Sequence, residues 1–252
     1  MSNLIPRDEF VRVATEFKAR LAATNSFEEM LVLWRSTSIA YSYDALDPFS
    51  PEYRGAVLDV YQKLTQIAYD EQSELTSTKQ SDESFEIGYP WVSRNLGVIS
   101  QELSKAVQAL AVFHARGLGG KSFIEFGAGW GNLAVPLAKS GQEVAVVDID
   151  GGFLSRISRI AAQENVQIAC FQGGFLEVAR SLPKKYDVAI FQSSFHHCLE
   201  FDDLLQELRD RVIDANGSIY FFAEPIYKDY TFPWGLRYDG ESLLAITFNH
   251  WL

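Results

Sequence analysis

The sequence predicts an α/β domain with a doubly wound, mostly parallel sheet, preceded by a helical segment. From residue 121 onward, short apolar runs alternate with stretches of helical periodicity, which is the pattern of βαβ units. The runs VAVVD, DVAIF and SIYFF are almost continuously apolar, as expected of strands that helices cover on both faces. A chain of 252 residues has room for one extended domain or two small ones. We expect residues 1–92 to form a helical N-terminal cap and linker, and residues 93–252 to form the sheet domain.

Three amphipathic helices are expected in the N-terminal part. Their predicted ranges are 7–23, 26–39 and 51–68. Ser26 and Glu29 form a capping-box pair at the start of the second helix. Ser50 as N-cap, followed by Pro51 at the first helical position, begins the third helix. The polar stretch over residues 73–88 has little to bury and reads as a connection between two modules.

Five strands and five helices are expected in the second part of the chain. The strands are predicted at Ser122–Phe126, Glu143–Asp148, Gln167–Gln172, Asp187–Gln192 and Gly217–Ala223. The helices are predicted at Ser93–Arg116, Asn132–Ser140, Phe153–Glu164, Phe175–Leu182 and Phe201–Val212.

Three glycines separate the first strand of this domain from the following helix. In the segment FIEFGAGWGN, Glu125 precedes Gly127, Gly129 and Gly131. Glycines let the backbone bend tightly and approach a ligand where side chains would collide. The second strand ends in Asp148, at the place where an acidic side chain reaches the hydroxyls of a ribose. These residues together predict a nucleoside-binding site.

The glycine spacing discriminates between nucleosides. A dinucleotide fingerprint requires G-x-G-x-x-G, but Asn132 occupies the last glycine position of that pattern. The spacing therefore disfavours NAD. No Lys-Ser or Lys-Thr pair follows the glycines, which excludes a P-loop.

Glu125, the three glycines and Asp148 resemble the first motif of the class I methyltransferases that use S-adenosylmethionine. The run YDVAIFQSSFHHCLEF is similar to the fourth motif of that family, a strand followed by a loop over the reacting methyl group. The resemblance extends from Lys121 to about Pro225 and implies a Rossmann-like fold with S-adenosylmethionine as cofactor. The cofactor-binding residues that it implies are Glu125, Gly127, Ala128, Gly129, Gly131, Asp148, Ile149, Gly174, Phe175 and Gln192.

The chain departs from this family pattern at two places. Gly173, Gly174 and Phe175 stand where the family often has a Gly-Asp pair, so backbone groups or Phe175 would have to contact the adenine. The family sheet also closes with an antiparallel strand pair, but ITFNHWL is the sole strand-like run after Glu224. We therefore expect this pair to be incomplete in a truncated sequence. By resemblance, the helical cap serves as the element that covers the acceptor pocket.

Three titratable residues are candidates for catalysis. His196 and His197 follow the fourth predicted strand and Glu224 follows the fifth, at the carboxyl edge where ligands bind. If the acceptor is a hydroxyl, a base within hydrogen-bond reach would assist, and His196 is our first choice. Equally open is that one of the two histidines only packs in the loop or caps the next helix. No metal is required for this reaction.

The composition limits the classes of binding partner that we expect. The chain carries 22 Lys plus Arg against 33 Asp plus Glu, a net charge of -11, which disfavours nucleic acid and membrane surfaces. Its 2 cysteines fit a reducing cytoplasm. A small-molecule acceptor remains, and we expect methylation of an oxygen of a sugar or secondary metabolite. An aromatic stretch with polar groups near the C-terminus suits such an acceptor, and equally open is that it anchors loops or forms a dimer contact (Tyr227, Tyr230, Phe232, Trp234, Arg237, Asp239).

Two other functions stay open at this point. A chain without its last strands could be a catalytically inactive relative that binds or scaffolds, acting as a subunit of a homodimer. A nicotinamide-dependent reductase is the third reading, and the position of Asn132 argues against it.

Overall fold

The computed structural model describes residues 93–224 without a gap. N-terminal to these it describes residues 3–5, 12, 16, 19–20, 23–26, 28–29, 32, 37–39, 46–47, 49–56 and 58. The chain divides into two compact units, one made of residues 1–70 and 225–252 and the other of residues 71–224.

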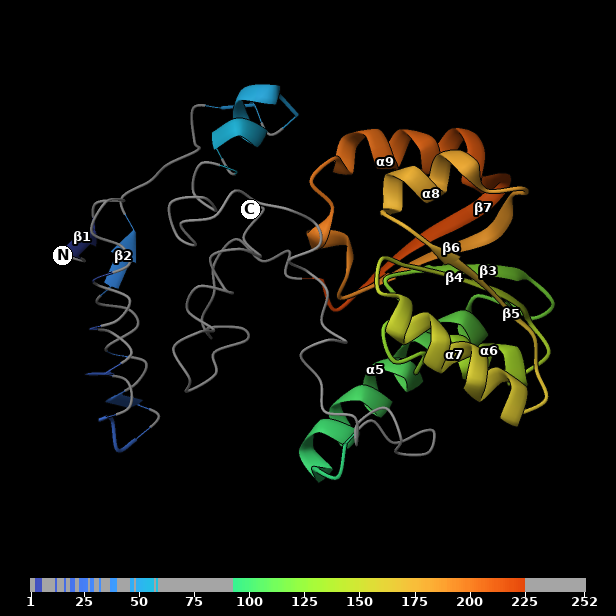
Figure 1. Cartoon of the computed structure of the whole chain (residues 1–252), viewed down its shortest axis with the longest axis horizontal. Helices are drawn as coiled ribbons and strands as arrows, with labels where there is room; N and C mark the ends of the chain where they lie inside the picture. The colour runs from blue at the N-terminus through green and yellow to red at the C-terminus, as the bar shows by residue number, and fades with distance from the viewer. Residues whose placement is uncertain are drawn as a thin grey trace. The chain divides into compact units, whose positions relative to one another are not determined.

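The unit of residues 71–224 is built on a five-stranded sheet (Figure 1). Its strands are β3 (Ser122–Phe126), β4 (Glu143–Asp148), β5 (Ile168–Gln172), β6 (Tyr186–Gln192) and β7 (Ile213–Phe222). They lie in the order β5-β4-β3-β6-β7, and every pair of neighbours is parallel. The predicted doubly wound α/β fold is confirmed.

Helices cover both faces of this sheet (Figure 1). One layer contains α5 (Leu96–Ala115), α6 (Ala134–Lys139) and α7 (Gly151–Gln163). The other contains α8 (Phe175–Ser181) and α9 (Phe201–Glu207), which continues into the π-helical turn η5 (Leu208–Val212). Alternate strand residues supply the two cores, so Phe123 packs in the first layer while its neighbour Ile124 packs in the second. Burial on both faces explains the continuous apolar runs of the sequence.

The strand order places a topological switch point between β3 and β6. The chain leaves β3 for α6 on one face and leaves β6 for α9 on the opposite face. The loops after these two neighbouring strands diverge at the carboxyl edge, where open α/β sheets form their ligand crevice. Both motifs singled out in the sequence lie at this point.

The observed elements follow the expected ranges with small shifts. The fifth strand begins at Ile213 rather than at Gly217, because Ile213 pairs with Tyr186 before the register shifts and Ser218 pairs with Val188. A short 3-10 turn, η4 (Phe195–His197), was not expected between β6 and α9. Helix α5 begins after Asn95, whose side chain accepts hydrogen bonds from two backbone N–H groups of the first turn.

The N-terminal unit contains a strand pair that the sequence reading missed. β1 (Asn3–Ile5) pairs in parallel with β2 (Thr37–Ile39). The expectation that the second helix extends to Ile39 is therefore wrong at its C-terminal end. Two of the three residues of β2 are β-branched, and such side chains favour extended backbone once a pairing partner is present.

The capping signals of this unit are confirmed. The backbone N–H of Glu29 donates to Ser26 Oγ at 3.1 Å. The Glu29 carboxylate returns to the backbone N–H of Asn25 at 2.8 Å, one residue earlier than in an ideal capping box. Ser50 Oγ accepts from the backbone N–H of Tyr53 at 3.1 Å, as an N-cap does. Helical residues follow both caps in the described part of the unit.

Several expectations lie outside the described residues. They concern the connection over residues 73–88, the later part of the third helix, the aromatic stretch from Tyr227 and the ITFNHWL run. Within the residues that the structure describes, no helix combines the length and the apolar character needed to cross a bilayer.

Candidate active site

The glycine turn after β3 is held by its own backbone and by close packing. Gly127, Gly129 and Gly131 all have positive φ, at 72°, 48° and 77°. A Cβ on Gly127 would lie 2.5 Å from the Cβ of Ser194, and one on Gly131 would lie 2.8 Å from Ile157 Cγ1. A Cβ on Gly129 would meet no atom within 4 Å. The outer glycines therefore permit close packing, whereas the middle glycine faces open space that a ligand can enter.

Asp148, at the end of β4, is tied to this turn. Its Oδ2 accepts a hydrogen bond from the backbone N–H of Gly129 at 2.9 Å, and its Oδ1 accepts one from Asp150 at 2.9 Å. The residue is only 7% exposed, and burial raises the pKa of the carboxyl although both hydrogen bonds lower it. Each carboxylate oxygen can accept a second donor, so Asp148 remains able to bind hydroxyl groups.

Glu125, near the end of β3, is the most deeply buried carboxyl of the site. Burial, together with the nearby charge of Asp148, raises the pKa of Glu125 to about 8. One carboxyl oxygen, Oε2, has no hydrogen-bond partner among the described residues. Gln192 ends β6 on the same face of the sheet, two residues beyond the register partner of Glu125, and its buried Oε1 likewise lacks a described partner. These two acceptors fit a ligand that brings hydrogen-bond donors.

Phe175 lies beside the glycine turn. Its Cζ would be 3.2 Å from a Cβ on Gly127, and its ring meets those of Phe126 and Phe191 edge-on. Gly174 is the N-cap of α8. The structure thus brings the ring of Phe175 to the place where the family often has an acidic residue, and the Glu177 carboxylate lies next to Gly173, 3.0 Å from the position of a Cβ on that glycine.

The remaining predicted cofactor residues adjoin this group. Ala128 is buried within the glycine turn, and its carbonyl accepts from the backbone N–H of Gly131 at 2.9 Å. Ile149 follows Asp148, and its carbonyl accepts from the Gln172 side chain at 3.4 Å. All ten predicted positions therefore lie at or near the carboxyl ends of β3, β4, β5 and β6.

The segments after β6 and β7 are joined by hydrogen bonds between residues of unusual conformation. Ser193 and Ala223 both have positive φ, at 54° and 53°, although neither is a glycine. Ser193 donates from its backbone N–H to the Phe222 carbonyl at 2.9 Å and from Oγ to the Ala223 carbonyl at 3.2 Å. Left-handed backbone at non-glycine residues persists where the surroundings fix it, and it is concentrated at functional sites.

His196 and Glu224 meet directly at this edge. His196 Nδ1 lies 2.7 Å from Glu224 Oε2, with the two side chains 8% and 3% exposed. The carboxylate also accepts from the backbone N–H groups of Ser194 at 2.8 Å, Phe195 at 3.0 Å and His196 at 3.3 Å. Burial by itself would raise the pKa of Glu224, but the hydrogen bonds from His196 and Ser194 outweigh it and hold this pKa below its ordinary value.

The two neighbouring histidines differ in their surroundings. His197 is exposed, and its ring centroid lies 4.2 Å from that of His196. His197 also lowers the pKa of Asp148 through its charge, which places it on the cofactor side of the turn. The ring of His196 is held by the Glu224 carboxylate.

Two residues of the site were missed by sequence reasoning. Ser194 donates from Oγ to the Phe126 carbonyl at 2.6 Å and packs on Gly127, which joins the loops after β3 and β6. Asp150 is the N-cap of α7 and donates to Asp148. Asp150 had a signal, because an Asp before two glycines and an apolar periodic stretch is a helix start. Ser194 had none, since its partner is remote in the sequence.

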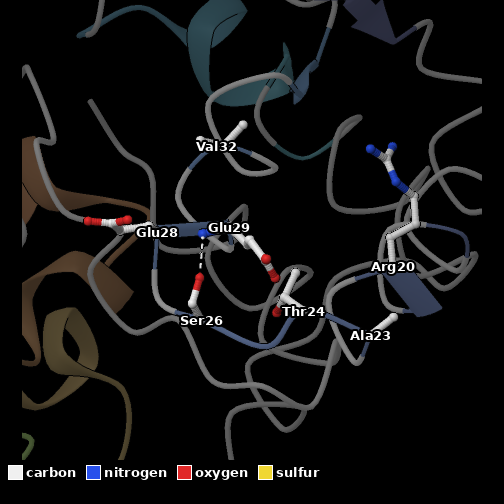
Figure 2. A pocket seen from close by; sticks show the side chains of 7 residues that line it. All are labelled: Arg20, Ala23, Thr24, Ser26, Glu28, Glu29 and Val32. Atoms are coloured by element: carbon white, nitrogen blue, oxygen red, sulfur yellow. Dashed lines mark hydrogen bonds between the residues drawn. The ribbon is translucent and has the colours of Figure 1, made fainter.

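A separate hollow lies in the N-terminal unit (Figure 2). It has a volume of about 680 Å³ and is lined by Arg20, Ala23, Thr24, Ser26, Glu28, Glu29 and Val32. None of the predicted site residues belongs to it. In the described part of the chain, no three His, Cys, Asp or Glu side chains are grouped so that they could hold a metal ion.

The fold and this edge define a class of protein. A doubly wound parallel sheet with a glycine turn at its switch point, followed by an acidic end to the next strand, is a Rossmann-like nucleoside-binding domain. Residues 124–219 match the family described as a methyltransferase domain. Residues 124–219 are therefore similar to the methyltransferase domains that use S-adenosylmethionine, and the unit that contains them has a Rossmann-like fold.

Solved methyltransferase structures resemble the chain at low sequence identity. Magnesium protoporphyrin IX methyltransferase from Synechocystis PCC 6803, with bound S-adenosylmethionine, is 20% identical over 57% of this chain and 73% of its own, with a TM-score of 0.47. The CcbJ methyltransferase from Streptomyces caelestis is 20% identical over 61% of this chain and 58% of its own, with a TM-score of 0.42.

TehB from Haemophilus influenzae is 14% identical over 47% of this chain and 39% of its own, with a TM-score of 0.40. The chain spans less than two thirds of the length of several of these structures. No curated protein matches the chain.

Proposed function

We propose that the chain transfers a methyl group from S-adenosylmethionine to a small-molecule acceptor, on an oxygen of a sugar or secondary metabolite. The observation that carries the proposal is the hydrogen bond from Gly129 to Asp148 beside open space, within the segment that matches the methyltransferase family. The cofactor residues would be Glu125, Gly127, Ala128, Gly129, Gly131, Asp148, Ile149, Gly174, Phe175 and Gln192.

The residues of this edge suit each part of such a cofactor. Asp148 would accept from the ribose hydroxyls through its remaining lone pairs. Glu125 Oε2 and Gln192 Oε1 would accept from donors at the methionine end, since both are buried acceptors without a described partner. Phe175 would pack on the adenine and leave its polar edge to backbone groups.

The chemistry asks little of the protein beyond alignment and proton removal. The bound cofactor supplies a methyl group already activated on a sulfonium, so its transfer is an in-line displacement. We assign His196 as the base that takes the proton of an acceptor hydroxyl. Its turn follows β6 at the switch point, and the loop is fixed against Phe126 and Ala223. The predicted cap, residues 1–92, is assigned to acceptor recognition by resemblance to the family.

Charge and cysteines support the rest of the proposal. A net charge of -11 favours a small acceptor over a nucleic acid. The chain has only 2 cysteines, few for a disulfide-bonded secreted protein, so a reducing cytoplasm is part of the proposal. A homodimer remains part of the proposal, to be tested by light scattering of the full chain.

Titration calorimetry with S-adenosylmethionine and with its demethylated product tests the cofactor assignment. Gly129→Arg should abolish binding, because the new side chain would occupy the open space beside Asp148. Gly117→Arg is the matched control, since Gly117 also has positive φ, at 66°, and open space around a Cβ, but lies after α5, away from the cofactor-binding edge. Absence of binding to the unmodified chain would refute the proposal. Binding without methyl transfer to any acceptor in a metabolite pool would favour the inactive relative instead.

A further inference from the structure

We propose that Glu224 is a positioning residue that fixes the ring orientation and tautomer of His196, and that it does not itself take a proton from the acceptor. This inference rests on the proposed function, because it concerns the base of that reaction. It changes the expectation that Glu224 is a catalytic residue of the same kind as His196.

The hydrogen bonds of Glu224 are directed inward. Oε1 accepts from the backbone N–H groups of Ser194 and Phe195 at 2.8 and 3.0 Å. Oε2 accepts from the backbone N–H of His196 at 3.3 Å and faces Nδ1 of the same residue at 2.7 Å. Four donors therefore surround the Glu224 carboxylate, and its side chain is only 3% exposed. With its lone pairs engaged in this way, Glu224 cannot also take a proton from the methyl-acceptor molecule.

The same contacts determine which nitrogen of His196 carries the proton. An ionised carboxylate only accepts hydrogen bonds, so the nitrogen that faces it must be the N–H. In the neutral ring the proton is therefore on Nδ1, and Nε2 keeps the lone pair. The three backbone donors keep the carboxylate ionised, and they tie its position to the turn that carries the imidazole.

The backbone around the pair is fixed in the same way. Ser193 and Ala223, the residues before Ser194 and Glu224, are both in the left-handed region and are hydrogen-bonded to each other. Ser194 is anchored through Oγ on the Phe126 carbonyl at 2.6 Å. These hydrogen bonds hold the loop that carries His196 in one conformation, as a base with a fixed orientation requires.

The charged and titratable groups around His196 come from three elements. Glu224 approaches from the end of β7, and the His197 ring, from the same turn as His196, lies with its centroid 4.2 Å away at a tilt of 39°. Asp148, at the end of β4, interacts with His197 through its charge. Glu224 is the only one of these groups for which the structure shows a direct hydrogen bond to the His196 ring.

The first test reads the tautomer of His196 and needs no substrate. Long-range ¹H–¹⁵N spectra of the full chain at about pH 8 should show the Nδ1–H form, with the signal assigned by its loss in His196→Gln. In Glu224→Gln, the amide can keep its oxygen on Ser194 and Phe195 and turn its NH₂ toward the ring. We expect the ring to change to the Nε2–H form. The Nε2–H form or a doubly protonated ring in the unmodified protein would overturn the proposal.

The second test uses the acceptor found by the product screen. Glu224→Gln should lower kcat about 100-fold, the contribution of a positioned base, with little change in affinity for S-adenosylmethionine. Glu224→Asp, which keeps the charge, should restore part of this loss, and the pH profile of kcat should flatten only in the Gln variant. Glu200→Gln removes the same charge from the start of α9 and serves as the matched control.

The outcomes separate the two proposals. If the unmodified chain does not bind S-adenosylmethionine, the proposed methyltransferase function is refuted, but the measured tautomer of His196 remains valid. An unchanged tautomer in a folded Glu224→Gln variant that still binds the cofactor refutes the role of Glu224 and leaves the function standing. Thermal unfolding of each variant identifies one that fails to fold, and the tautomer of His196 in the unmodified protein then decides the proposal.

Discussion

Glu125 is the residue whose ionisation the fold opposes. Its side chain is buried among the strands, Asp148 stands nearby with a like charge, and the pKa rises to about 8. A carboxyl with such a pKa is mostly protonated at neutral pH, so the edge carries less negative charge than its sequence suggests. A cation bound near Glu125 would favour its ionised form.

The stability of the protein should therefore depend on Glu125. The pKa of Glu125 is raised from 4.5 to about 8, because the folded protein favours the protonated carboxyl. The contribution of this protonated carboxyl to the free energy of unfolding is therefore fully present below about pH 4.5 and is lost as the pH rises through 8. Glu125→Gln keeps an acceptor for Ala134 but cannot ionise. We expect unmodified protein to lose a few kcal/mol of unfolding free energy between about pH 5 and pH 8.5, at about 1.4 kcal/mol per pKa unit, and the variant to lose much less.

Guanidinium unfolding of both proteins at the two pH values measures this difference. Asp214→Asn, which changes an exposed carboxylate on β7, serves as the comparison variant. Parallel pH dependences in unmodified protein and Glu125→Gln would contradict the prediction.

At the scale of residues, the sequence predicted the grouping of the glycine turn with Asp148 better than the contact between His196 and Glu224. Gly127, Gly129 and Asp148 are close in sequence and are linked by the geometry of one βαβ unit, so spacing alone located them. The pairing of His196 with Glu224 joins two segments that come together only when β6 and β7 pair. Periodicity carries no information about such a contact, and the sequence could name both residues without predicting that they touch.

At the scale of elements, the amino end of β6 is held by hydrogen bonds that lie away from the candidate site. Near its amino end, Asp187 accepts from the backbone N–H and hydroxyl of Ser122 at 2.8 and 2.9 Å and from Lys121 Nζ at 3.1 Å. These bonds join β6 to the start of β3, at the opposite edge of the sheet from Gln192. Asp187 begins the fourth family motif in the sequence, but its contacts are structural.

Asp187→Asn should lower the free energy of unfolding at neutral pH by about 1–2 kcal/mol, the usual worth of hydrogen bonds to a charged group. The hydrogen bonds from Ser122, first of all that from its backbone, lower the pKa of Asp187. Its contribution is therefore present above the ordinary pKa of 3.8 and is lost as the pH falls through the lowered value.

Urea unfolding at about pH 7 and about pH 3 should show a difference between the two proteins that shrinks in acid. Calorimetry should find the affinity of Asp187→Asn for S-adenosylmethionine unchanged. A loss of affinity comparable to that of Gly129→Arg would show that Asp187 acts on the site.

Elements with strong periodicity were predicted well, and short ones were not. The strands over Ser122–Phe126 and Glu143–Asp148 agree with β3 and β4 at both ends. β2 has only three residues, which are too few to show a period of two. The helical periodicity that precedes β2 therefore predicts a helix up to Ile39. The turn η4 depends on Glu224, whose position follows from β7.

At the scale of the whole molecule, one sheet edge gathers every predicted site residue. Residues from β3, β4, β5 and β6 converge there because parallel strands all end at the same edge. The order β5-β4-β3-β6-β7 then sends the loops after β3 and β6 to opposite faces, the arrangement at which open α/β sheets bind their ligands. The sequence predicted the parallel sheet and its carboxyl edge from the alternation of strands and helices, but it did not predict the strand order.

A ligand that binds this edge should stabilise the full chain. At about 100 times its dissociation constant, S-adenosylmethionine should add about 2.7 kcal/mol to the unfolding free energy and raise the Tm. NADPH should leave the Tm unchanged, because Asn132 breaks the dinucleotide spacing. Thermal unfolding with each ligand distinguishes the methyltransferase from the reductase, and a shift with NADPH alone would favour the reductase.

The contact between Gly127 and Ser194 constrains the order in which the two loops can evolve. A methyl group at position 127 would lie 2.5 Å from the Ser194 Cβ, so Gly127→Ala is blocked while any side chain remains at position 194. Ser194→Gly would have to come first, and it would forfeit the hydrogen bond to Phe126. The loops after β3 and β6 are thus coupled at these two positions, because the packing around Gly127 admits a side chain only if position 194 has none.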